Sequence, residues 1–140
     1  MDAIVVGTDG SPGAEAAVQK VIELAQSGAT IHLVCAYPGK SALERIGMTA
    51  RQEPADLRGV AADLLARGER KLKEAGFAVE KYAREGDPAQ TIIDVAGDTN
   101  ADLIVIGAHG NTGMRRFMLG GVAGKLAHHA PRSLLIVRED

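Results

Sequence analysis

Short apolar runs alternate along the chain with longer segments in which apolar residues recur every three or four positions. Runs of about four to eight apolar or β-branched residues are typical of buried strands, whereas the three- and four-residue spacing is typical of one helix face. The first pattern covers 3–6, 30–36, 77–84, 103–106 and 133–138, and the second covers 12–28, 57–76, 88–97 and 121–130. The alternation predicts five strands and four helices.

The order of these elements predicts an α/β fold with a mainly parallel sheet. Consecutive parallel strands need crossover connections, which are right-handed in nearly all proteins, so helices should cover both faces of the sheet. The runs at 3–6 and 103–106 are wholly apolar, as expected of strands that are buried on both faces. The segment 37–54 follows neither period and contains Pro and Gly residues, which predicts a long loop.

Two of the predicted helices begin with recognisable capping residues. Ser11 followed by Pro12 is typical of an N-cap and a first helical position. Asp87 and Pro88 repeat this arrangement, and Gln90 stands where the reciprocal residue of a capping box belongs. We therefore expect helices to begin directly after Ser11 and Asp87.

The composition indicates a single globular domain that spans 1–140. The chain has 140 residues, of which 46% are hydrophobic, and a formal net charge of −2 at pH 7. There is no basic excess that would favour nucleic acid and no apolar run near the ~20 residues of a membrane span, so we expect neither partner. The single Cys35 and the absence of a recognisable leader before the first strand favour the cytoplasm, with Cys35 as a buried structural thiol.

Glycine-rich loops follow the first and the fourth predicted strand. Gly107 and Gly110 come after the run 103–106, and Gly120 with Gly121 opens the last helix. Glycine lets backbone amides approach a ligand, and a helix N-terminus adds unpaired N–H groups with a partial positive charge, so this stretch is suited to cradle an anion. The alternative is that these glycines serve only tight turns and close helix packing.

Several familiar site patterns are missing from the sequence. Gly124-Lys125 lacks the first glycine and the final hydroxyl of a phosphate loop, and Gly7, Gly10 and Gly13 do not have the spacing of a dinucleotide fingerprint. There is no G-x-S-x-G elbow and no metal-spaced set of His, Cys and Asp. The acids of a phospho-receiver and the aromatic residues of a flavodoxin-like carrier are also missing. The sequence therefore predicts no catalytic residue and no metal ligands.

The pattern G-x2-G-x9-G formed by Gly107, Gly110 and Gly120 resembles the nucleotide-binding signature of the universal stress protein (UspA-like) family. The segments IVVGTDGS, GDPAQTI, DLIVIGAHG and SLLIVR also resemble that family in order and spacing, so the resemblance covers nearly the whole chain. It implies a Rossmann-like fold of the adenine nucleotide alpha hydrolase type, with strand order 3-2-1-4-5. Strands one and four are then neighbours, and the two glycine loops face each other across the crevice where such sheets bind ligands.

The resemblance also implies a site for ATP or another adenine nucleotide, with Mg²⁺ held by the phosphates. Asp9 would contact the ribose or base side, although a turn residue that bonds its own backbone is the alternative. His109 and Arg115 would face the phosphates or else solvent, and the backbone near Ala36 would meet the adenine edge. The full set of expected nucleotide-binding residues is Gly7, Thr8, Asp9, Ala36, Gly107, His109, Gly110, Arg115, Gly120, Gly121, Val122 and Ala123.

Two positions depart from the family pattern, because Gly121 and Ala123 stand where nucleotide-binding members usually carry hydroxyl residues. Two hypotheses follow. In the first, the protein binds an adenine nucleotide in a regulatory or stress-response role and hydrolyses it slowly at most, since no general base is placed in the sequence. In the second, nucleotide binding has been lost and the domain acts as a protein interaction module.

The last strand predicts a homodimer. In the implied order it lies at one edge of the sheet, and Leu134 to Val137 form an uninterrupted apolar run, whereas the opposite edge strand carries Glu80 and Lys81, which discourage pairing. A second copy can pair antiparallel with the strand 133–138 across a two-fold axis. The alternative is that the helices and the long loop cover this strand.

Overall fold

The computed structural model describes residues 1–39, 54–110 and 120–139, and strands alternate with helices through these ranges. In chain order the elements are β1 (Ala3–Gly7), α1 (Pro12–Leu24), β2 (Thr30–Tyr37), α3 (Pro54–Glu74), β3 (Ala78–Glu85), α4 (Pro88–Asp98), β4 (Leu103–Gly107), α5 (Gly121–His129) and β5 (Ser133–Val137). The predicted strands and helices are all found at the expected places. The loop expected at 37–54 lies largely outside the described residues.

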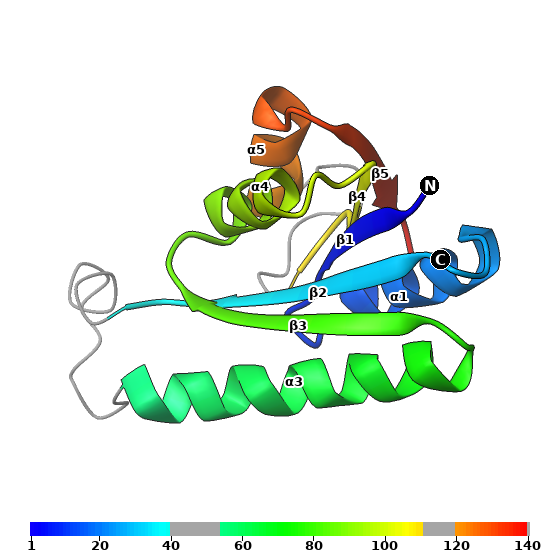
Figure 1. Cartoon of the computed structure of the whole chain (residues 1–140). Coiled ribbons are helices and arrows are strands. Elements are labelled where there is room, and N and C mark those ends of the chain that lie inside the picture. Colours follow the sequence, from blue (N-terminus) through cyan, green and yellow to red (C-terminus); the bar gives the residue numbers. More distant parts are fainter. Residues whose placement is uncertain (40–53, 111–119, 140) are drawn as a thin grey trace.

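The five strands form one sheet in the order β3-β2-β1-β4-β5, with every neighbouring pair parallel. This confirms the predicted fold and strand order, which can be followed in Figure 1. Val5 of β1 pairs with His32 of β2 on one side and with Ile104 of β4 on the other. β1 is therefore central, and the strand order reverses between β1 and β4.

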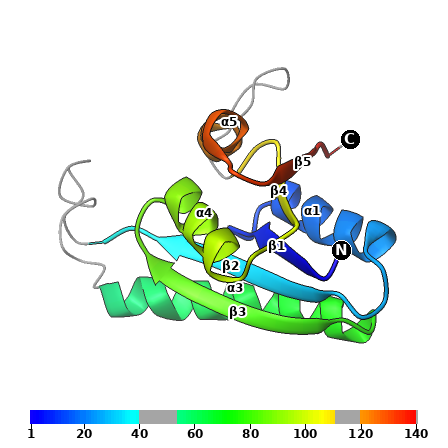
Figure 2. The ribbon, with the colours of Figure 1, turned by 45° about the horizontal axis from the view of Figure 1, so that its top comes forward.

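Two helices cover each face of the sheet. α1 and α3 pack on one face, and α4 and α5 pack on the other, as Figures 1 and 2 show from two directions. Side chains alternate along each strand. In β1, Ile4 and Val6 join the core under α1 and α3, while Val5 joins the core under α4 and α5.

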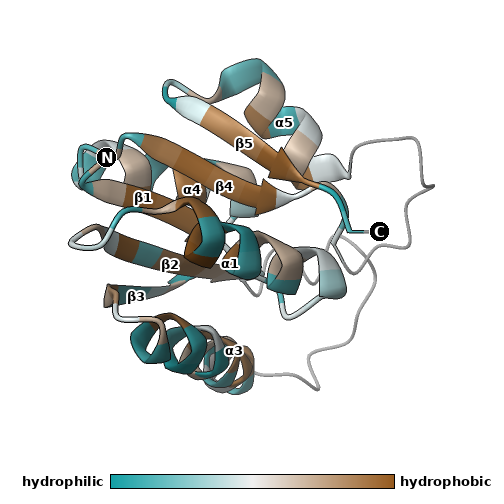
Figure 3. Ribbon diagram, turned by 90° about the vertical axis from the view of Figure 1, so that its right-hand side faces the viewer, coloured by the Kyte–Doolittle hydropathy of each residue, from teal (hydrophilic) through white to brown (hydrophobic). Residues whose placement is uncertain are grey.

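Apolar residues are concentrated in β1, β4 and β5, whereas the helices mix apolar and polar positions, as Figure 3 shows. In α3, Leu65 and Leu72 are buried against the sheet. Val60 belongs to the same apolar pattern in the sequence, yet its side chain is 55% exposed. The difference arises because α3 is amphipathic, and Val60 lies outside the narrow stripe that contacts the sheet.

The helix starts follow the predicted capping residues, with one correction. The Ser11 side chain accepts a hydrogen bond from the Ala14 N–H at 3.2 Å, and the Asp87 side chain accepts one from the Gln90 N–H at 3.0 Å. The side chain of Gln90 accepts no hydrogen bond from the Asp87 N–H, and its amide nitrogen instead donates to Asp94 at 2.9 Å. The capping box expected at this helix start is therefore not formed.

Candidate functional site

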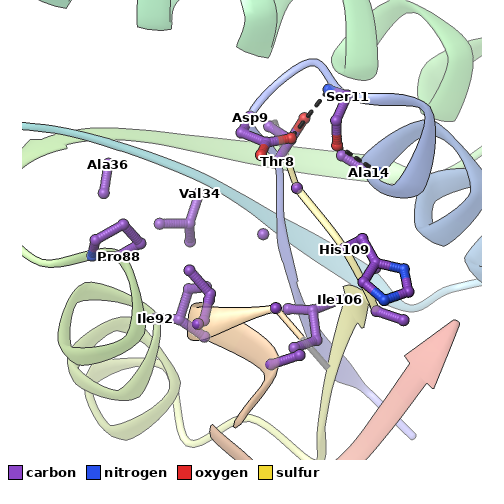
Figure 4. A pocket seen from close by; sticks show the side chains of 18 residues that line it. Thr8, Asp9, Ser11, Ala14, Val34, Ala36, Pro88, Ile92, Ile106 and His109 are labelled. Atoms are coloured by element: carbon purple, nitrogen blue, oxygen red, sulfur yellow. Dashed lines mark hydrogen bonds between the residues drawn. The ribbon is translucent and has the colours of Figure 1, made fainter. Parts of the chain in front are cut away.

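A cavity of about 280 Å³ opens at the carboxyl ends of the central strands. This volume is close to the lower end of the ~300–1,000 Å³ typical of ligand pockets. The cavity lies where the strand order reverses, which is where open α/β sheets bind ligands (Figure 4). Its lining includes the expected residues that the structure describes, namely Gly7, Thr8, Asp9, Ala36, Gly107, His109, Gly110, Gly120, Gly121, Val122 and Ala123. Arg115 lies outside the described residues.

The loop between β1 and α1 forms the first wall of the cavity. The Asp9 Oδ1 atom accepts a hydrogen bond from the Ser11 N–H at 2.9 Å, and Gly10 between them has a left-handed φ of 77°. The alternative interpretation of Asp9 as a turn residue is thus correct for this oxygen. The other oxygen, Oδ2, lies against Gly110 on the opposite wall, where it would collide with a Cβ atom.

The start of α5 forms part of the second wall. Its N-cap is Gly120, whose N–H donates to the Ala108 carbonyl at 2.8 Å, and no side chain caps the helix. The Gly124 N–H donates to the Gly120 carbonyl at 2.8 Å, so the amides of residues 121–123 have no acceptor within the helix. All three residues line the cavity. Three N–H donors and the positive end of a helix dipole therefore border a space suited to an anion.

Gly107 allows two backbones to approach closely. A Cβ atom at Gly107 would lie 2.6 Å from the carbonyl carbon and oxygen of Gly13, and a Cβ atom at Gly13 would collide with the carbonyl oxygen of His109. The first turn of α1 can pack this closely on the end of β4 only because both Gly13 and Gly107 lack side chains. The packing explanation of the glycines is therefore correct for Gly107, whether or not a ligand binds.

An apolar side of the cavity was not predicted from the sequence. It comes from β2, β4 and the first turns of α4, and Figure 4 shows these side chains together. Two periodicities in the sequence point to it. Val34 and Ala36 are two residues apart in a strand, so their side chains lie on the same face of the sheet. Pro88 and Ile92 are four residues apart in a helix, so they also share one face. The unpredicted lining residues are Ser11, Ala14, Val34, Pro88, Ile92, Ile106 and Ala108.

Few ionisable groups line the described part of the cavity. Asp9 and His109 are the ones that the described residues contribute. Cys35 is 4% exposed on the other face of β2, and burial, with a smaller contribution from the charge of Asp9, raises its pKa to about 11. Cys35 is thus a buried neutral thiol at pH 7, as expected. Within 1–39, 54–110 and 120–139, no three His, Cys, Asp or Glu residues are grouped to hold a metal ion.

An ion pair joins the two helices that border the cavity. The Lys125 ammonium of α5 lies 3.1 Å from the Asp87 carboxylate, which caps α4 beside Pro88. The backbone N–H of Gln90 is the main cause that lowers the pKa of Asp87, and Lys125 adds to it. Both side chains are substantially exposed, so the pair is expected to contribute little to stability.

Comparisons with known proteins agree with this architecture. The Universal stress protein family model matches residues 1–138 of the chain. Universal stress protein MJ0531 of Methanocaldococcus jannaschii is 28% identical over 145 residues, which cover 97% of this chain and 81% of that protein.

Two solved structures extend the comparison. The structure of MJ0577 from Methanocaldococcus jannaschii is similar to this chain with a TM-score of 0.86 at 22% identity, over 99% of this chain and 96% of that one. A universal stress protein in complex with cAMP is similar with a TM-score of 0.69 at 25% identity, over 98% of this chain and 96% of that one. No helix among the described residues is long and apolar enough to cross a bilayer.

Proposed function

The chain belongs to the universal stress protein family, and from this premise we propose that its cavity binds ATP or a related adenine nucleotide in a regulatory, stress-response role. The observation that carries the proposal is the pairing, in one cavity, of an apolar wall with three helix-start amides that have no acceptor within the helix. The apolar wall suits a nucleobase, and the amides suit a phosphate group. The likeness to a family member that is in complex with cAMP supports an adenine nucleotide as the ligand.

The cavity residues divide between the parts of such a nucleotide. We assign the adenine edge to the backbone at Ala36, a ribose hydroxyl to Asp9 Oδ2, and the phosphates to the amides of Gly110 and 121–123 together with His109. Arg115 remains assigned to the phosphates. Mg²⁺ would be held by the phosphate oxygens, since phosphates are its usual protein-site ligands.

Binding rather than turnover is the proposed activity. The Asp9 carboxylate holds the Ser11 N–H through one oxygen, and the sequence places no other acid as a general base. We therefore expect hydrolysis to be slow if it takes place. The buried, unpaired Cys35 is consistent with a cytoplasmic location, which we include in the proposal.

The second candidate function is that of an interaction module that binds no nucleotide. It is favoured by Gly121 and Ala123, because neither residue brings a hydroxyl to the cavity. The two functions differ in one direct observation. Protein that is purified without added ligand should release an adenine nucleotide into an acid extract, detected by mass spectrometry and by the ultraviolet spectrum. If none is found, and calorimetry detects no binding of ATP, AMP or cAMP, nucleotide binding is refuted.

Glycine substitutions in the cavity provide the second test. A Cβ atom at Gly110 would collide with Asp9 Oδ2, and one at Gly120 would lie 3.2 Å from the Ala108 carbonyl oxygen. Gly110→Val and Gly120→Val should each weaken nucleotide binding at least about tenfold, the loss expected when a phosphate loses one charge-assisted hydrogen bond. The circular dichroism spectrum should stay close to that of the unmodified protein.

Gly124→Ala is the matched control, because this residue lies on α5 and its added Cβ would have no described atom within 4 Å apart from its chain neighbours and the helix backbone. It should bind nucleotide as the unmodified protein does. Unchanged affinity in both Gly110→Val and Gly120→Val would remove the phosphate assignment.

We also propose a homodimer joined through β5. β5 is an edge strand, and Leu134, Leu135 and Ile136 are only half-buried within one chain. The Val137 carbonyl accepts a hydrogen bond from the Ala108 N–H, so the backbone groups of Val137 face inward. Backbone groups of successive residues in a strand point to opposite sides, so those of Ile136 face the open edge. This edge can pair with its copy.

A further inference from the structure

We propose that a second, smaller cavity between α1 and α3 binds a small organic anion, meaning one carboxylate or phosphate group on a short apolar stem. The cavity measures about 70 Å³ and lies beside the β1–α1 loop, away from the apolar wall of the larger cavity. A cavity needs roughly 10–15 Å³ to hold one water molecule, so this cavity has room for a ligand of a few heavy atoms. Thr8 and Ala14 line both cavities.

Two glycines pack closely against leucine side chains at the walls of this cavity. A Cβ atom at Gly68 of α3 would lie 2.7 Å from the Leu33 Cδ2 atom of β2, so α3 sits tightly on the sheet at this point. A Cβ atom at Gly10, whose φ is 77°, would lie 2.5 Å from the Leu64 Cδ2 atom of α3. Leu64 and Gly68 are four residues apart and therefore lie on one helix face toward the cavity. α3 is therefore closely packed against β2 and the β1–α1 loop at this cavity.

The charges at this cavity favour an anion. Arg67 and Lys71 both line it, and neither forms an ion pair with any carboxylate that the structure describes. Glu69 on the same helix, by contrast, pairs with Lys73 at 3.3 Å and with Lys81 at 3.1 Å. Like charges four residues apart destabilise a helix, and an anion bound between Arg67 and Lys71 would offset this repulsion.

The apolar part of the lining determines which anions fit best. Ala14, Val18 and Leu64 form an apolar surface next to the two cations. Inorganic phosphate can use the cations only, whereas a small organic acid can use both the cations and the apolar surface. Glu15 also lines the cavity, from the first turn of α1, and its carboxylate opposes an anion. Removing the charge of Glu15 should therefore strengthen the binding of an anion.

Three probes with the same four-carbon chain separate the effect of charge from that of the apolar stem. We would titrate butyrate, butylammonium and butanol at constant ionic strength and follow the backbone amide signals by NMR. Butyrate should cause saturable shifts at Gly10, Leu64 and Gly68, and butylammonium should cause none there. Signals of Gly110 and 121–123 report separately on the larger cavity. Equal shifts with butanol, or no saturable shift with butyrate, would overturn the proposal.

Substitutions complete the test. Arg67→Gln with Lys71→Gln should weaken butyrate binding about tenfold or more, because two charge-assisted contacts are lost. Glu15→Gln should strengthen binding. Arg70→Gln is the matched control, since Arg70 is an exposed residue of α3 that does not line the cavity. If Arg70→Gln weakens binding as much as the double variant does, the attraction is diffuse and the proposed site is wrong.

Discussion

At the scale of single residues, Asp9 uses its two carboxylate oxygens in different ways. Oδ1 is held by the Ser11 N–H at 2.9 Å, while Oδ2 lies against Gly110 across the cavity. The first contact fixes the side chain, and the second oxygen is thereby held beside the cavity in which we propose that a nucleotide binds. Such preorganisation lowers the entropic cost of binding.

We predict that Asp9→Ala weakens the binding of ATP and of AMP by a similar amount, about 1.5–3 kcal/mol, which is the range for a hydrogen bond to a charged group. The reason is that a ribose hydroxyl is common to both nucleotides. Calorimetry with the two ligands measures the difference. Asp9→Asn serves as the control, because its amide oxygen can still accept from the Ser11 N–H. A loss for ATP alone would place Asp9 beside the phosphates instead.

Gly121 allows the missing hydroxyl to be restored. Apart from its chain neighbours and the backbone of its own helix, no described atom lies within 4 Å of a Cβ at Gly121, so a serine has room there. We predict that Gly121→Ser tightens ATP binding by about 0.5–1.5 kcal/mol, the net value of one hydrogen bond. Calorimetry beside Gly121→Ala separates the hydroxyl from the added carbon. Weaker binding by both Gly121→Ser and Gly121→Ala would show that the ligand occupies the space that a side chain at this position would fill.

At the scale of elements, Asp102 joins the starts of two central strands. Its Oδ2 atom, just before β4, accepts hydrogen bonds from the Asp2 N–H at 2.8 Å and the Ala3 N–H at 3.1 Å. The Ala3 N–H is the main cause that lowers the pKa of Asp102 below its ordinary value of 3.8, followed by the Asp2 N–H. The ionised carboxylate is therefore the form that the fold favours.

The sign of the pH dependence follows from this lowered pKa. Asp102 should stabilise the fold above pH 3.8, its ordinary pKa, and lose that contribution as the pH falls through the lowered value. Asp102→Asn should thus be less stable than the unmodified protein at pH 7, and the difference should shrink in acid. Urea unfolding at pH 7 and at an acidic pH below 3.8 measures this difference in the free energy of unfolding. Asp63→Asn, an exposed change on α3, should not show this pattern.

Elements were easier to predict from the sequence than the cavity. The periods of two and of about 3.6 residues reflect burial of single elements, so they identified each strand and helix. Local periods place Val34 on the strand face of Ala36 and Ile92 on the helix face of Pro88, but they do not reveal that α4 packs over β2 so that the two faces line one cavity. The side chain of Gln90 shows the same limit, because a competing partner, Asp94, decided where it bonded.

At the scale of the whole molecule, the proposed dimer depends on one open sheet edge. We predict that Ile136→Pro shifts the mass from a dimer toward a monomer or into aggregates, since proline removes an N–H that points to this edge. Light scattering during size-exclusion chromatography gives the mass. A cooperative unfolding transition must be retained, which shows that the inner pairing of β5 with β4 is intact. A monodisperse monomer of the unmodified protein at micromolar concentration would refute the dimer.

The contact between Gly13 and Gly107 has a consequence for how this protein can change. An alanine scan cannot detect this contact by truncation, because there is no side chain to remove at either position. Only an increase in size reveals it, and the partner residue cannot shrink in compensation because it is already a glycine. A larger residue at Gly107 would meet the backbone of Gly13, and one at Gly13 would meet the carbonyl oxygen of His109, so either change requires a shift of the backbone. Because both residues are already glycine, a larger residue at one position cannot be compensated by a smaller one at the other.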